Sequence, residues 1–196
     1  ALTPFGREVK IRIDSIFAAC DGRAGQLTVI GEKEHMDIAS RMYGSFPEVF
    51  ISDETASVFS RSTSSERVVQ SMRIFDATLK SCASGLQIEE RSGGSCNAYL
   101  NHYTPEYREY YENGPWKEEM ETVRGEWIMP ERLIDTLFSD PAFVAKRIPS
   151  RVNFMTELFS VASILQGSPV GVSLYDVFTE EEIFALWRTQ NLNQYL

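Results

Sequence analysis

The stretch that decides the expected fold is Val58-Phe59-Ser60-Arg61-Ser62-Thr63-Ser64-Ser65-Glu66-Arg67-Val68-Val69-Gln70-Ser71. It reads as a short strand, a turn rich in hydroxyl groups and the start of a helix. The helix is expected to reach about residue 79, because apolar residues at 68, 72, 75 and 79 share one face. A second short strand is expected over 86–90. A helix, strand, helix and strand within residues 1–96 indicate part of an α/β layer.

The turn between this strand and this helix favours an oxyanion. The first N–H groups of a helix lack partners within the helix, and its dipole is positive at that end. Arg61 ends the strand and Arg67 lies on the first helical turn, so both guanidinium groups could bind one phosphate. The alternative is that Ser64 or Ser65 only caps the helix and both arginines are solvated.

The rest of the chain is expected to be helical. A helix is predicted over 4–20, where Thr3 and Pro4 supply a start signal and Val9, Ile13, Ile16 and Phe17 share one apolar face. A second helix is predicted over about 28–43, with Ile30, Ile38 and Met42 near one stripe. Residues 97–196 carry repeated helix starts, at Thr104-Pro105, Asp140-Pro141 and Thr179-Glu180-Glu181-Glu182. They also contain a strongly apolar helix over about 152–165 that should be buried. The predicted fold class is therefore α/β with a large all-α portion, and a boundary near residue 96 separates an α/β part (1–96) from a helical part (97–196).

Charge and composition exclude several classes of function. The chain has 196 residues and a formal net charge of −9, which argues against binding nucleic acid or an anionic membrane surface. No apolar run is long enough for a membrane span. The two histidines, His35 and His102, are too few for a zinc site built from histidines. We expect no metal and no other cofactor.

Several motifs in the sequence resemble those of a known family. The pattern Arg-Ser-Thr-x-x-x-Arg-x-x-x-Ser over 61–71 resembles the middle motif of the histidine acid phosphatases. The segment 25–35 resembles that family's Gly-x-Leu-Thr-x-x-Gly helix start. Together with 21–27 and the closing segment 186–191, these motifs most resemble the bacterial form of the multiple inositol polyphosphate phosphatase branch.

The resemblance implies a fold, a reaction and roles for two arginines. It implies part of a histidine-phosphatase-like α/β core with an inserted helical cap domain. Such enzymes hydrolyse phosphomonoesters, here small-molecule inositol polyphosphates such as phytate, through a phosphohistidine intermediate and without a metal. Arg67 matches the phosphate-binding arginine, and Arg61 matches the arginine that opens the motif. The resemblance also implies an exported protein, periplasmic or extracellular.

Two catalytic motifs of that family are missing from the sequence. There is no Arg-His-Gly, because His35 precedes Met36 and His102 precedes Tyr103, and there is no His-Asp or His-Ala-Glu. We therefore expect the middle portion of such a phosphatase, a fragment inactive by itself. The alternative is a non-catalytic helical binding or scaffold domain in which the arginines are structural.

Other candidate residues have weaker signals. Lys146, Arg147 and Arg151 form the basic cluster of the helical part and border a polyphosphate pocket if the resemblance holds; otherwise they are solvated. Cys82 and Cys96 flank a Gly-Gly and Ser-rich segment that could bring them together as a disulfide, with three free thiols as the alternative. His35 is expected to be a surface or half-buried side chain. The tyrosines at 103, 107, 110 and 111 have helical spacing and are expected to line a core, with stacking against a ligand as the alternative.

Overall fold

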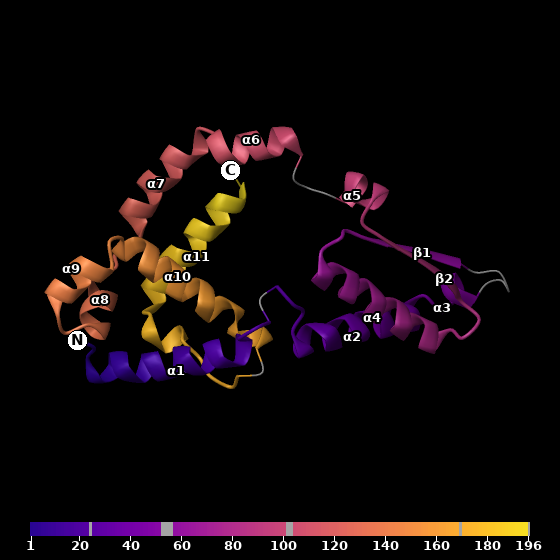
Figure 1. Cartoon of the computed structure of the whole chain (residues 1–196), viewed down its shortest axis with the longest axis horizontal. Helices are drawn as coiled ribbons and strands as arrows, with labels where there is room; N and C mark the ends of the chain where they lie inside the picture. The colour runs from indigo at the N-terminus through magenta and orange to yellow at the C-terminus, as the bar shows by residue number, and fades with distance from the viewer. Residues whose placement is uncertain (24, 52–56, 101–103, 169, 196) are drawn as a thin grey trace. The chain divides into compact units, whose positions relative to one another are not determined.

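The computed structural model describes the whole chain except residues 24, 52–56, 101–103, 169 and 196. The described part is mostly helical, with one small sheet of two strands (Figure 1). In chain order the elements are α1 (Pro4–Cys20), α2 (Val29–Ser45), α3 (Pro47–Ile51), β1 (Ser57–Ser62), α4 (Glu66–Cys82), β2 (Gln87–Ser92), α5 (Ser95–Leu100), α6 (Pro105–Asn113), α7 (Trp116–Trp127), α8 (Glu131–Leu137), α9 (Pro141–Arg147), α10 (Arg151–Ile164), η1 (Leu165–Gly167), η2 (Tyr175–Val177) and α11 (Glu180–Tyr195).

The chain divides into two compact units. One unit, called here the sheet unit, is Gly22–Arg108. The other, the helical unit, joins Ala1–Asp21 to Glu109–Leu196. This division differs from the boundary expected near residue 96, because α1 packs against α8 of the C-terminal part.

The sheet unit is built on β1, α4 and β2. The two strands are parallel, and their register pairs Ser57 with Gln87 and Ser62 with Ser92. Because parallel strands need a crossover between them, α4 returns the chain to the start of β2 and lies beside the sheet (Figure 1). The expected strand–turn–helix over 58–71 and the second strand are therefore confirmed, each within a few residues of the observed bounds.

A small core holds this unit together. Phe50, Leu79, Ala83 and Leu86 are buried in it, and Val58 and Ile88 of the two strands pack against them. Helix α2 lies alongside α4, and the Gln70 side-chain amide donates a 2.6 Å hydrogen bond to Glu32 Oε1 between them.

The apolar stripe expected on α2 does not form part of that core. Ile38 and Met42 are exposed, and in α2 the residue that is buried is Ala39. A small side chain at this position leaves room for the neighbouring helix to approach closely, so the periodicity of the larger side chains indicated the wrong face.

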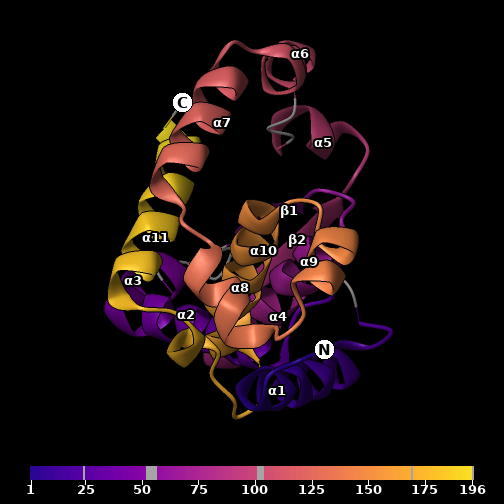
Figure 2. The same ribbon diagram turned by 90° about the vertical axis from the view of Figure 1, so that its left-hand side faces the viewer.

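The helical unit has the larger core, to which α1, α8, α10 and α11 contribute. Val9 and Ile16 of α1 pack with Leu133, Leu158 and Leu186. As expected, the helix at 151–164 is buried along much of its length. Figure 2 shows α7 running beside α11, and these two helices are in contact.

Thr3 joins the start of α1 to the end of α8. Its hydroxyl caps α1 by accepting a 2.9 Å hydrogen bond from the Gly6 N–H, and it donates to the Thr136 carbonyl oxygen at 2.6 Å. Its backbone N–H donates to the Leu137 carbonyl oxygen at 3.0 Å. The expected capping role of Thr3 is confirmed, and it includes a tertiary contact that the sequence pattern did not indicate.

No helix in the described parts of the chain has both the length and the apolar character that crossing a membrane requires.

Candidate functional site

The turn that follows β1 leads directly into α4. Ser62 ends the strand, and Ser65 occupies the N-cap position of α4, where its side chain makes no capping hydrogen bond. The Ser65 N–H donates to Thr63 Oγ1 at 3.4 Å, and the Ser64 N–H donates to the side-chain oxygen of Asn97 at 3.2 Å. The turn is thus stabilised by the Thr63 hydroxyl and by Asn97 of α5, whereas the Ser65 hydroxyl does not cap α4.

The end of β2 meets the same turn. Gly93 and Gly94 follow β2 with φ of 63° and 53°, in the left-handed region that glycine adopts most readily. The Gly93 N–H donates to the Ser62 carbonyl oxygen at 3.1 Å. A β-carbon on Gly93 would lie 3.3 Å from Ser64 Cβ. The carboxyl ends of both strands, the turn and the start of α4 therefore form one continuous edge of the sheet unit.

The two arginines predicted from the sequence flank this turn. Arg61 is the second-last residue of β1 and Arg67 is the second residue of α4, and both side chains are exposed. Neither guanidinium makes a hydrogen bond or ion pair with any residue in the described parts of the chain. Both charges are available to an anion from solution.

The open face of the sheet adds a further arginine beside Arg61. The register places Arg61 opposite Arg91, and neighbours at the same level of a sheet lie on the same face. Arg91 is already occupied, because its guanidinium donates to Glu89 Oε1 at 2.6 Å. Phe59 is 60% exposed on this open face. Arg61 is therefore the unpaired cation of the two.

Buried polar groups that the sequence pattern did not indicate lie between β1 and α4. Ser60 Oγ donates a 2.6 Å hydrogen bond to Asp76 Oδ1, and Asp76 is only 2% exposed. The second carboxylate oxygen of Asp76 and the hydroxyl of Ser62 are buried without a hydrogen-bond partner. Burial raises the pKa of Asp76, the hydrogen bond from Ser60 lowers it, and the charge of Glu90 raises it. In the sequence, the one indication that Asp76 is buried is its position four residues after Met72, next to the apolar stripe of α4.

The basic cluster belongs to the other unit. Lys146 and Arg147 end α9 and Arg151 begins α10, and all three are exposed. The helices α9 and α10 belong to the helical unit, whereas Arg61 and Arg67 belong to the sheet unit.

The cysteines, the tyrosines and His35 can also be placed. Cys20, Cys82 and Cys96 are free thiols, so the candidate Cys82–Cys96 disulfide is absent from the structure. The core expected for the tyrosine run is wrong for α6, which has no buried residue. Its three tyrosines are each more than two-fifths exposed. His35 is half-buried in α2, as expected, whereas His102 and Tyr103 lie outside the described residues. Within the described residues, no group of three or more metal-ligating side chains gathers.

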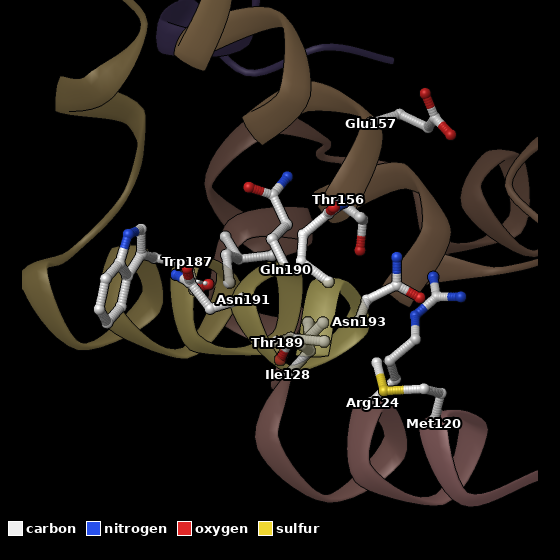
Figure 3. Close-up of a pocket in the computed structure, with 12 residues that line it drawn as sticks. Met120, Arg124, Ile128, Thr156, Glu157, Trp187, Thr189, Gln190, Asn191 and Asn193 are labelled. Carbon is white, nitrogen blue, oxygen red and sulfur yellow. Dashed lines mark hydrogen bonds between the residues drawn. The ribbon is translucent and has the colours of Figure 1, made fainter. Parts of the chain in front are cut away.

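A separate cleft of about 620 Å³ lies in the helical unit, between α7, α10 and α11. Figure 3 shows Trp187 at one end of it and Arg124 with Met120 at the other. Arg124 donates to Asn153 at 2.7 Å and to Glu121 at 2.9 Å, so its charge is already paired. The polar lining consists mainly of uncharged side chains: Thr156, Thr189, Gln190, Asn191, Asn193 and Gln194.

The chain matches no family model, and no curated protein matches it significantly.

Proposed function

We propose that this chain is the phosphate-binding middle portion of a phosphomonoesterase of the histidine acid phosphatase type, acting on a small-molecule phosphate ester such as an inositol polyphosphate. The observation that carries the proposal is the pair of unpaired arginines, Arg61 and Arg67, on either side of the turn that opens α4. An exported location goes with the same resemblance.

The local geometry supports binding of a phosphate group. The first N–H groups of α4 have no side-chain cap from Ser65, and the helix dipole is positive there. A guanidinium on each side of the turn adds two charges whose planar donors match phosphate oxygens. The net charge of −9 makes these local cations more important, because the chain as a whole repels polyanions.

In the proposed reaction this chain binds and orients the phosphoryl group. Arg67 donates hydrogen bonds to its non-bridging oxygens and stabilises the negative charge that they carry in the transition state. Arg61, on the exposed face of β1, adds a second unpaired positive charge for the same phosphoryl group. The nucleophilic histidine and the proton donor belong to Arg-His-Gly and His-Asp or His-Ala-Glu motifs outside these 196 residues, so the isolated chain binds without turnover.

The cleft in the helical unit favours the second candidate, a non-catalytic binding domain. Its floor is apolar, with Met120, Ile128 and Leu186, and its polar lining is mostly carboxamide and hydroxyl groups. Such a lining is suited to a neutral hydrogen-bonding ligand and not to a polyphosphate. In this alternative, a neutral ligand binds the chain and an inositol polyphosphate does not.

Calorimetric titration with myo-inositol hexakisphosphate tests the first candidate. We expect binding that weakens with added salt, and an Arg67→Ala variant that binds about tenfold to a hundredfold more weakly, since a hydrogen bond to a charged group contributes about 1.5–3 kcal/mol. Lys80→Ala is the matched control, because Lys80 is an exposed cation of the same helix, about 20 Å from Arg67 along its axis. Equal weakening in both variants, or no binding by the wild-type chain, would contradict the proposal.

A further inference from the structure

Asp76 is a buried acid at the contact between α4 and β1. It is 2% exposed, and its Oδ1 accepts the 2.6 Å hydrogen bond from Ser60 Oγ. Its other oxygen, Oδ2, has no hydrogen-bond partner. An ionised carboxylate needs several donors to replace the water that it loses on burial, and Asp76 has one.

Among the described residues, no cation forms an ion pair or hydrogen bond with the buried carboxyl group. On its own helix, Arg73 is exposed and faces Glu90, with its Nε 3.7 Å from Glu90 Oε2, and Lys80 is exposed near the helix end. On β1 the group that faces Asp76 is the neutral hydroxyl of Ser60. On β2 it is Glu90, which is negative. No group of α2, which also packs on α4, contributes to the pKa shift of Asp76. The surroundings of Asp76 therefore favour its neutral form.

We propose that Asp76 is a proton-dependent clamp between α4 and β1: the protonated acid stabilises the sheet unit, and its ionisation loosens the helix from the strand. The clamp is independent of phosphate binding, since it depends only on the packing within Gly22–Arg108. The sheet unit is therefore more stable when Asp76 is protonated. The helical unit has no buried acidic side chain among its described residues.

The sign of the effect follows from linkage. Burial, the main cause, raises the pKa of Asp76 in the folded state above its value in the unfolded chain. Between these two values the folded state holds a proton that the unfolded state has lost, so stability falls as pH rises. The fall ends above the folded-state pKa, where both states are ionised. Below the unfolded-state pKa of Asp76 both states are protonated, and the stabilisation by the protonated acid is fully present.

Hydrogen exchange of the full chain, measured by mass spectrometry from pH 4 to 8 and corrected for intrinsic exchange rates, tests the clamp. We expect the opening of β1 and α4 to increase by up to about tenfold per pH unit in the window set by Asp76. Peptides from α10 in the helical unit are the internal reference and should not share this slope. Asp76→Asn keeps an acceptor for Ser60 without a charge, so it should abolish the slope and protect β1 and α4 better at neutral pH.

Asp37→Asn is the matched control, because Asp37 is an exposed aspartate of α2 in the same unit. It should keep the wild-type slope. A titration of the Asp76 carboxyl carbon by NMR in the wild-type chain is the second measurement, and it should give a pKa above the ordinary aspartate value. A pKa at or below that value, or the same pH slope in wild-type and Asp76→Asn chains, would overturn the clamp.

Discussion

Arg132 of α8 and Glu182 of α11 form a bidentate ion pair in the helical unit. Arg132 Nε donates to Glu182 Oε1 at 2.7 Å, and Arg132 Nη2 bonds to Oε2 of the same carboxylate. Glu182 Oε2 also accepts from the Thr179 N–H at 2.9 Å, while Thr179 Oγ1 accepts from the Glu182 N–H at 3.3 Å. One carboxylate thus closes the capping box of α11 and ties that helix to α8.

Glu182→Ala should therefore destabilise the helical unit. Both the cap and the charged hydrogen bonds are lost, and we expect a cost of about 1–3 kcal/mol in urea unfolding. Glu180→Ala removes an exposed acid from the same helical turn and should cost less than about 1 kcal/mol. Similar losses in the two variants would show that Glu182 acts only through the helix dipole.

Gly6 and Gly125 should respond oppositely to alanine. A β-carbon on Gly6 would lie 2.1 Å from the Leu137 carbonyl oxygen, whereas one on Gly125 in α7 meets nothing within 4 Å. Both glycines are helical, so alanine favours the helix by about 1 kcal/mol at each site. The clash at Gly6 outweighs this gain, and Gly6→Ala should lower the unfolding midpoint while Gly125→Ala raises it. A higher midpoint for Gly6→Ala would contradict the close approach of α1 and α8.

Ser60→Ala should shift the pH response of the sheet unit to higher pH. The hydrogen bond from Ser60 lowers the pKa of Asp76, so removing the hydroxyl raises that pKa further. The stability lost on ionisation should then be lost at a higher pH than in the wild-type chain. Hydrogen exchange of α4 peptides measures the shift, and an unchanged or lower midpoint would show that the hydroxyl does not donate to Asp76.

The cysteines should react with a thiol reagent in order of exposure. Cys20 is exposed, Cys82 is half-buried and Cys96 is buried. We expect one fast thiol under native conditions and three after unfolding in denaturant, counted by absorbance. A single thiol after unfolding without reductant would instead indicate that Cys82 and Cys96 pair in the oxidised protein.

The sequence predicted local elements better than their packing. The segment 58–71 combines a strand pattern, turn residues and a helical stripe, and its strand–turn–helix is confirmed, as are the helix starts at Thr3, Asp140 and Thr179. Periodicity identifies a helix but does not say which neighbour covers it. For this reason Phe17 of α1, expected to be on the buried face, is exposed.

The candidate site could be predicted only in part for the same reason. Arg61 and Arg67 lie where a strand–turn–helix places them. The contacts from Gly93 and Asn97 come from residues about thirty positions away, and they depend on the parallel register of β1 and β2. Asp76 was not predicted, because an acid on the margin of an apolar stripe usually points to solvent.

The helical unit is interrupted in sequence, and this sets an order for synthesis. The chain leaves that unit after Asp21 and returns to it at Glu109. During translation from the N-terminus, the sheet unit can complete its contacts first. Val9 and Ile16 of α1 stay without their packing partners until α8 and α10 have been synthesised. Deleting residues 1–21 would leave all contacts within the sheet unit in place. The same deletion would remove α1, with Val9 and Ile16, from the core of the helical unit.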